Sequence, residues 1–131
     1  MLERIVASVA PTPRGPYSHA VRAGDFIFVS GQGPLDPVTN QWKLGDVASE
    51  TRTTLENIRA ILRACGADLK DVIKCSVFLT DINDFAAMNQ VYSEFFGEIR
   101  PARTTVQAVL PGRGTKIEID CVAYKPAAGG F

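Results

Sequence analysis

Two amphipathic segments separated by one strand-like run limit the folds open to this chain of 131 residues. In the first, apolar residues recur at helical spacing over 47–65, with Asp46 placed to cap the amino end and Gly66 to terminate the helix. The second spans about 84–97. Between them, the alternation in 71–81 predicts a strand. A strand, a helix and another strand in this order imply a crossover and some parallel pairing.

The apolar positions define which side of each element should face the core. The second helix would begin at a cap on Asn83 or Asp84 and end at Gly97. Its stripe comprises Phe85, Met88, Val91, Tyr92, Phe95 and Phe96. The inward side of the strand between the helices comprises Ile73, Cys75, Val77 and Leu79.

Further strands are expected on both sides of this central unit. Residues 3–9 predict one strand, and 19–32 predict a hairpin that turns at Gly24. The second arm of the hairpin, 26–30, is mostly apolar on both faces, which is typical of a strand buried on both sides.

The order of the predicted elements favours an α+β domain covering residues 1–131, with one mixed sheet and two helices on one face. The last two strands are expected at about 104–110 and 115–124, joined by a Pro/Gly turn. Two helices cannot shelter every apolar side chain of such a sheet, so an uncovered apolar face should meet a partner. We therefore expect self-association. The side chains concerned are Phe26, Phe28, Val109, Val122 and Tyr124.

Composition excludes several classes of protein. Fourteen basic residues balance fourteen acidic ones, which argues against a general nucleic-acid binder. The chain has a single histidine, His19, and its cysteines lack paired metal-ligand spacing, so a zinc site is not expected. Their odd number indicates reduced thiols, and with no evident signal peptide or membrane-length apolar run we expect a cytoplasmic protein. The cysteines are Cys65, Cys75 and Cys121.

Residues 100–120 carry the candidate chemistry. Arg103 opens one expected strand, and Glu118 lies on the next, on the face opposite Ile117 and Ile119. Either residue alone is more typical of a solvated surface. Together on adjacent antiparallel strands, they suggest a guanidinium that binds a carboxylate and a carboxylate that orients or deprotonates water. Tyr17 and Ser30 are polar groups at a loop and a strand end, where binding groups often lie.

At these residues the sequence resembles the RidA (YjgF/YER057c-type) family of reactive intermediate deaminases. The resemblance spans nearly the whole chain, and its specificity comes from several segments in order. These segments are GPYSHAV at 15–21, FVSGQGPLDP at 28–37, TRTTLENIRAIL at 51–62, MNQVYSEFF at 88–96, RPART at 100–104 and LPGRGTKIEID at 110–120.

The resemblance implies a chorismate-mutase-like α+β fold and a homotrimer with three clefts between subunits. It implies that Arg103 binds the substrate carboxylate and that Glu118 positions water. It also implies that Tyr17 and Ser30 line the cleft, while backbone groups of Gly31 and Thr105 contact the ligand. The implied activity is hydrolysis of enamines or imines of small 2-keto acids, such as 2-aminoacrylate and 2-iminopropanoate, to the keto acid and ammonia. No metal or organic cofactor is expected.

Three positions depart from the pattern of the family. Thr105 stands where cysteine is common, Gly33 where a larger apolar residue is common, and Asp120 where a second glutamate is common. The first two would change the width of the pocket and the range of substrates. Two other functions stay open: an RNA-cleaving or translation-inhibiting protein, and a non-catalytic ligand-binding or chaperone-like trimer.

Overall fold

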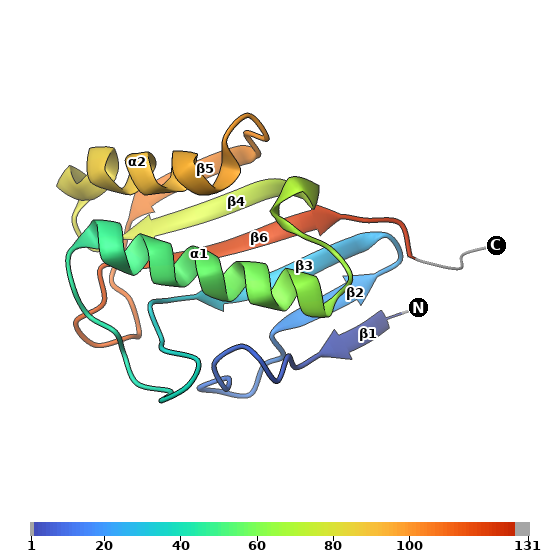
Figure 1. The fold of residues 1–131 in the computed structure, drawn as a ribbon. Coiled ribbons are helices and arrows are strands. Elements are labelled where there is room, and N and C mark those ends of the chain that lie inside the picture. The colour runs from blue at the N-terminus through green and yellow to red at the C-terminus, as the bar shows by residue number, and fades with distance from the viewer. Residues whose placement is uncertain (1, 128–131) are drawn as a thin grey trace.

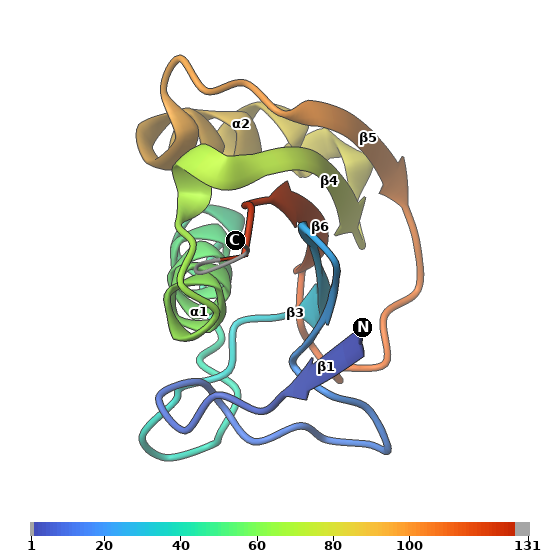
Figure 2. The ribbon, with the colours of Figure 1, turned by 90° about the vertical axis from the view of Figure 1, so that its right-hand side faces the viewer.

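The computed structural model, which describes residues 2–127, has one six-stranded mixed sheet with both helices on the same face (Figures 1 and 2). The strand order is β1-β2-β3-β6-β4-β5. This confirms the predicted α+β class. The elements are β1 Leu2–Ile5, β2 Ala20–Ala23, β3 Phe26–Gln32, α1 Val47–Ala64, β4 Val72–Leu79, α2 Phe85–Phe96, β5 Ala102–Gln107 and β6 Ile117–Tyr124, with short 3-10 turns at Leu69–Asp71 and Ile82–Asp84.

The expected hairpin of the last two strands is wrong. Strand β5 pairs in parallel with β4 at the edge of the sheet, whereas β6 lies between β3 and β4 and is antiparallel to both. Residues 108–116 contain the proline and glycines of a tight turn, but they carry the chain past β4 rather than back along β5. Turn residues specify a local change of direction and do not specify which strand becomes the neighbour.

The helix boundaries follow local capping chemistry. The side chain of Asp46 accepts a hydrogen bond from an amide of the first turn of α1, and Gly66 follows the helix with φ +79°, as predicted. Gly97 ends α2 with φ +57°. Asp84 occupies the capping position of α2 without a side-chain cap bond, because the preceding 3-10 turn is capped instead by Asp81. Neither helix within residues 2–127 is long and apolar enough to cross a membrane.

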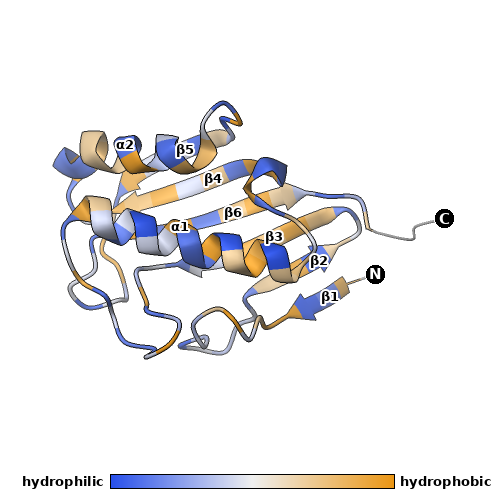
Figure 3. Ribbon diagram, viewed as in Figure 1, coloured by the Kyte–Doolittle hydropathy of each residue, from blue (hydrophilic) through white to orange (hydrophobic). Residues whose placement is uncertain are grey.

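The core lies between the sheet and the helices. Hydrophobic and hydrophilic segments alternate along α1 (Figure 3). Its buried residues include Leu55, Ile58 and Ile61, as expected for an apolar side that packs on the strands. Ile73, expected to face inward, is 45% exposed, because the β4–β6 register shifts between Val72 and Lys74 and brings Val72 to the core. Fully buried side chains include Ile27, Leu55, Ile58, Ile61, Leu62, Val77, Leu79, Met88, Ile117 and Ile119.

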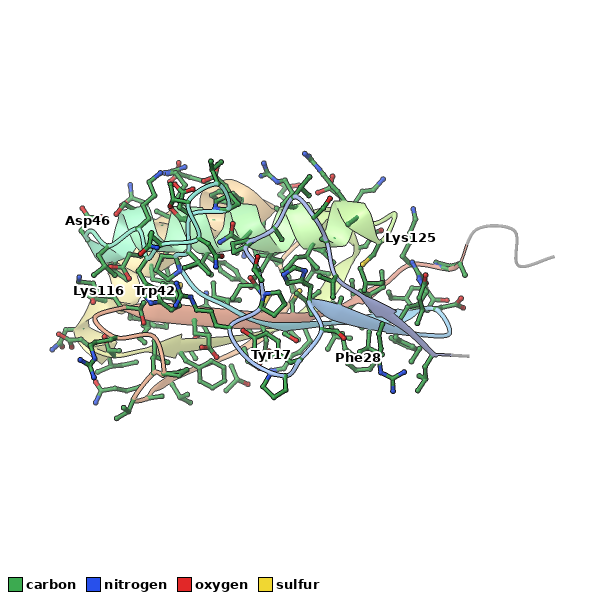
Figure 4. The ribbon with its side chains drawn as sticks, turned by 90° about the horizontal axis from the view of Figure 1, so that it is seen from below. Tyr17, Phe28, Trp42, Asp46, Lys116 and Lys125 are labelled. Carbon is green, nitrogen blue, oxygen red and sulfur yellow. The ribbon has the colours of Figure 1, made fainter. Side chains whose placement is uncertain are left out.

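The opposite face of the sheet is uncovered in the single chain. Phe26 and Phe28 are 41% and 48% exposed, so β3 is buried on one side only and the expectation of two buried sides is not met within one chain. Figure 4 shows Phe28 on the side away from the helices. Tyr124 is 45% exposed and stacks edge-on against Phe26. Val109, expected on this face, lies beyond the end of β5.

The three cysteines are free thiols. Cys75 and Cys121 are buried and lie opposite each other on β4 and β6. Burial raises the pKa of both thiols, which keeps them protonated and poorly nucleophilic. Both act as small core residues, as predicted.

Candidate functional site

A cavity of about 410 Å³ lies at one end of the sheet, where the loop before β2, the end of β3 and the start of β6 meet. Three of the predicted site residues, Tyr17, Gly31 and Glu118, line it. Ser30, Arg103 and Thr105 do not. The structure therefore brings half of the predicted site together within one chain.

Glu118 owes its place to the absence of a side chain at Gly31. A Cβ atom built on Gly31 would lie 2.5 Å from Oε2 of Glu118, closer than real Cβ atoms approach a neighbour. The β3–β6 register also shifts between Val29 and Gln32, which places Ser30 and Gly31 in an irregularity of the strand. Such irregularities re-aim side chains and are frequent beside active sites. Gly31 thus leaves room for the carboxylate to lie against the backbone at the cavity wall.

The environment of Glu118 favours its protonated form. Burial raises the pKa of the Glu118 carboxyl above its ordinary value, and the negative charge of Asp120, two residues along the same face of β6, raises it further. A carboxylate with a raised pKa is a stronger base than an exposed one. This residue can therefore accept a proton from water in the cavity.

We expect Asp120→Asn to lower the pKa of Glu118 without restoring its ordinary value of 4.5. The substitution removes the charge repulsion, which is the smaller cause, and leaves the burial, which is the larger. A carbon-13 NMR titration of the Glu118 carboxyl should show the midpoint at lower pH in the variant. Glu56→Gln, on the exposed side of α1, is the control and should leave the midpoint unchanged. An unshifted midpoint in Asp120→Asn would remove Asp120 as a cause.

A second buried carboxylate, which the sequence patterns did not reveal, fixes the start of β6. Glu50 is fully buried in the first turn of α1 and accepts hydrogen bonds from the backbone amides of Lys116 (2.7 Å) and Gly45 (3.1 Å). The ammonium of Lys116 lies 3.4 Å from Oε2 of Glu50 and donates to the carbonyl of Gly45 (2.7 Å). Figure 4 shows Lys116 at the amino end of α1, beside Asp46. These bonds anchor the strand two residues before Glu118.

Buried hydrogen bonds fix the loop that carries Tyr17. Nδ1 of His19 accepts from the amide of Ala7 (2.7 Å), so the ring proton lies on Nε2, which donates to the carbonyl of Pro11. The hydroxyl of Ser30 donates to the carbonyl of Ser18 (2.6 Å). The side chain of Ser30, which was expected to line the cleft, therefore supports the loop instead.

Arg103 lies in a separate environment under α2. Its guanidinium carbon is 4.7 Å from the ring centroid of Tyr92 and 5.5 Å from that of Phe85, and one nitrogen is 4.0 Å from the sulfur of Met88. Such cation–π contacts hold an arginine while leaving its N–H groups available. Thr105 lies two residues along the same face, and its buried hydroxyl has no hydrogen-bond partner within residues 2–127.

Arg103 and Glu118 project to opposite faces of the sheet. In the register, Arg103 is level with Cys75 and Cys121, whose side chains point to the helices. Glu118 is three residues from Cys121, so it points to the other side. Strand β4 also lies between their strands. The expectation that the two residues share adjacent antiparallel strands is therefore wrong, because it depended on the hairpin that β5 and β6 do not form.

The indole of Trp42 fills a slot made by two glycines. A Cβ atom on Gly33 would lie 3.1 Å from the indole, and one on Gly112 would lie 3.0 Å from it. The guanidinium of Arg14 stacks over the same ring at 5.0 Å. Trp42 thus occupies the space that a larger residue at position 33 would take, and it forms a wall of the cavity.

The described part of the chain offers no metal-binding cluster. Within residues 2–127, no three His, Cys, Asp or Glu side chains lie close enough together to hold a metal ion.

Comparison with known proteins places the chain in a family. The profile of the family described as Endoribonuclease L-PSP matches residues 7–125. The chain belongs to this family, which is also called YjgF or RidA. A RutC family protein from Pyrococcus horikoshii is 51% identical, over 95% of this chain and 99% of the relative.

Two further members of the family carry functional information in their names. A protein named 2-iminobutanoate/2-iminopropanoate deaminase from Capra hircus is 40% identical, over 95% of this chain and 92% of its own. The crystal structure of E. coli TdcF with bound serine has a TM-score of 0.88 and 40% identity, over 94% of this chain and 98% of TdcF. The predicted resemblance to the RidA family is thereby confirmed.

Proposed function

We propose that the protein hydrolyses imines of 2-keto acids, and the enamines that tautomerise to them, to the keto acid and ammonia. Water adds to the imine carbon and gives a tetrahedral carbinolamine. Collapse of this intermediate breaks the C–N bond, forms the C=O bond and releases ammonia. One water molecule is consumed, and no electrons are gained or lost. The observation that carries the proposal is the Glu118 carboxylate, held against Gly31 in a cavity and with a raised pKa.

Relatives support the chemistry and the type of ligand. One member of the family, 40% identical, is named a 2-iminobutanoate/2-iminopropanoate deaminase. Another, TdcF, has been crystallised with serine, a small carboxylate-bearing molecule. An imine of a 2-keto acid also carries a carboxylate beside the reacting carbon, and an arginine binds a carboxylate in a bidentate manner.

In the proposed mechanism, Arg103 of one copy and Glu118 of another form each site. Arg103 fixes the substrate carboxylate so that the imine carbon lies beside a water molecule that Glu118 orients and deprotonates. Positioning of this kind can lower a barrier by up to about 7–11 kcal/mol. Two copies are needed because the residues lie on opposite faces of one sheet. Tyr17, the backbone of Gly31 and the backbone of Thr105 would complete the contacts.

We expect the protein to sediment as a homotrimer, at three times the chain mass of 14.2 kDa. The exposed apolar face around Phe28 would be buried between copies. Phe28→Glu should dissociate the assembly, because it would place a charge in that interface. Val38→Glu, at a position that is 91% exposed on a turn, is the matched control and should remain assembled. Analytical ultracentrifugation at micromolar concentration distinguishes these results, and a stable wild-type monomer would contradict the shared cleft.

The proposed activity is tested by keto-acid release from freshly generated imines of graded side-chain size. Amino-acid oxidation produces the imine in situ, and the protein should accelerate its decay to keto acid above the spontaneous rate. Protein treated with EDTA should be equally active. If EDTA abolished activity and zinc restored it, the mechanism would be wrong. Keto-acid binding without any acceleration would instead favour a non-catalytic binding protein.

RNA cleavage is the alternative that the family description itself raises. The balanced charge of 14 basic and 14 acidic residues gives little general attraction for RNA. The single histidine is buried and engaged at both ring nitrogens, so it cannot serve as the general base that cleavage of RNA at a 2′-hydroxyl needs. Cleavage by highly purified wild type that disappears in a Glu118 or Arg103 variant would favour the nuclease instead.

A further inference from the structure

We propose that the cavity beside Glu118 binds a second carboxylate, at the end of the substrate side chain. The preferred substrates would then be imines of dicarboxylic 2-keto acids. This inference rests on the proposed function and specifies its substrate class. It is carried by the size of the cavity, by two arginines in its lining and by the stacking of one of them, Arg14, on Trp42.

The cavity is larger than the imine of pyruvate requires. Its volume of about 410 Å³ falls within the range of roughly 300–1,000 Å³ that is usual for small-molecule sites. The reacting carbon must lie at Glu118, on one wall. The remaining space extends toward Trp42, Arg14 and Arg113, where the side chain of the substrate would lie.

The charged residues that line the rest of the cavity favour an anionic group there. Arg14 and Arg113 line the cavity, and Glu118 is its one acidic lining residue. Within residues 2–127, neither arginine takes part in an ion pair. Both arginines are exposed. A carboxylate would pair with their guanidinium groups, whereas an uncharged side chain would gain no such contact. Since Arg103 is assigned to the carboxylate next to the imine, these two arginines remain for a second one.

Arg14 is already held in position before a ligand binds. One of its nitrogens donates to the carbonyl of Asn40 (2.7 Å), and its guanidinium stacks on Trp42 at 5.0 Å. Trp42 is itself confined by Gly33 and Gly112. A group that is fixed in this way loses little conformational freedom on binding, which favours affinity. The stacked arginine leaves further N–H donors for a carboxylate.

The test compares two imines generated in situ by oxidation of glutamate and of methionine, which have side chains of similar length but different charge. The wild type should show the higher kcat/KM with the glutamate-derived imine. Arg113→Gln should lower the glutamate-to-methionine ratio about tenfold or more, as expected for loss of a charge-assisted hydrogen bond. Arg14→Gln should act in the same direction. The control is Arg59→Gln, which removes an arginine stacked on Phe95 at the same 5.0 Å on α1, and should leave the ratio unchanged.

Binding of the keto-acid products gives a second measurement that does not need turnover. 2-Oxoglutarate should bind the wild type more tightly than 4-methylthio-2-oxobutanoate, the keto acid from methionine, and Arg113→Gln should abolish most of the difference. If neither imine is hydrolysed but this preference is found, the proposed activity fails and the second-carboxylate site stands. If imines are hydrolysed but neither assay shows a preference for the second carboxylate, or if both arginine variants retain it, this inference is overturned and the proposed activity stands.

Discussion

Replacing Glu118 with glutamine should lower kcat for imine hydrolysis by about a hundredfold to ten-thousandfold, the usual contribution of a general base. Glutamine keeps the shape of the side chain beside Gly31 but cannot accept a proton at its amide. Binding of small carboxylates such as pyruvate should persist. It should become somewhat tighter, because a negative charge is removed from the cavity. Stopped-flow turnover and calorimetric titration on the same preparation measure the two effects.

The companion variant for this experiment is Glu56→Gln, which makes the same chemical change on the exposed side of α1 and should retain full turnover. Both proteins should have the sedimentation behaviour and the melting temperature of the wild type, because Glu118 lines a cavity rather than the core. Wild-type turnover by Glu118→Gln would exclude the carboxylate as the base, however well the variant bound ligand.

Arg103→Lys should weaken carboxylate binding and lower kcat/KM by roughly tenfold to a hundredfold. Lysine keeps the charge but lacks the planar fork, so a bidentate contact becomes a single one. The loss corresponds to about 1.5–3 kcal/mol for a charge-assisted hydrogen bond. The stacking on Tyr92 and Phe85 that orients the guanidinium would also weaken. Pyruvate titration and imine turnover should therefore decline together, unlike the separate effects expected at Glu118.

Arg59→Lys provides the matched comparison, since Arg59 also stacks on an aromatic ring, that of Phe95, at 5.0 Å. It should leave both ligand affinity and turnover at wild-type values. If Arg103→Lys had the carboxylate affinity and the kcat/KM of the wild type, Arg103 would be an ordinary packed surface residue. The proposal that it binds the substrate carboxylate would then be wrong.

The sequence was informative wherever structure depends on neighbours along the chain. Helices at Val47–Ala64 and Phe85–Phe96 follow from apolar periodicity, and the hairpin at Gly24 follows from its turn residues. The position of β5 at the edge, parallel to β4, depends on pairing between distant segments. A proline–glycine segment looks the same whether it closes a hairpin or crosses over a strand, so local chemistry could not decide.

The candidate site shows the same difference between features set by local sequence and features set by distant contacts. The alternation of Ile117, Glu118 and Ile119 placed the carboxylate on the outward face correctly. The position of Arg103 relative to Glu118 could not be inferred, because which residues share a face depends on which strands are neighbours and on their register. Glu50 and Trp42 were missed since their roles depend on contacts with residues far away in sequence. The glycines at 31 and 33 were the visible signal, because alternate glycines at a strand end indicate close approach by other groups.

The packing of Trp42 against Gly33 and Gly112 couples three positions during sequence evolution. A Cβ atom at position 33 or 112 would lie 3.1 or 3.0 Å from the indole, so either glycine can be exchanged only if the tryptophan shifts. We expect a relative with a bulky apolar residue at position 33 to have a smaller residue at 42 or a displaced loop. Positions 33, 42 and 112 should vary as a set across an alignment. An ancestor that exchanged one arrangement for the other would have passed through an intermediate with either a clash or an empty slot at the cavity wall.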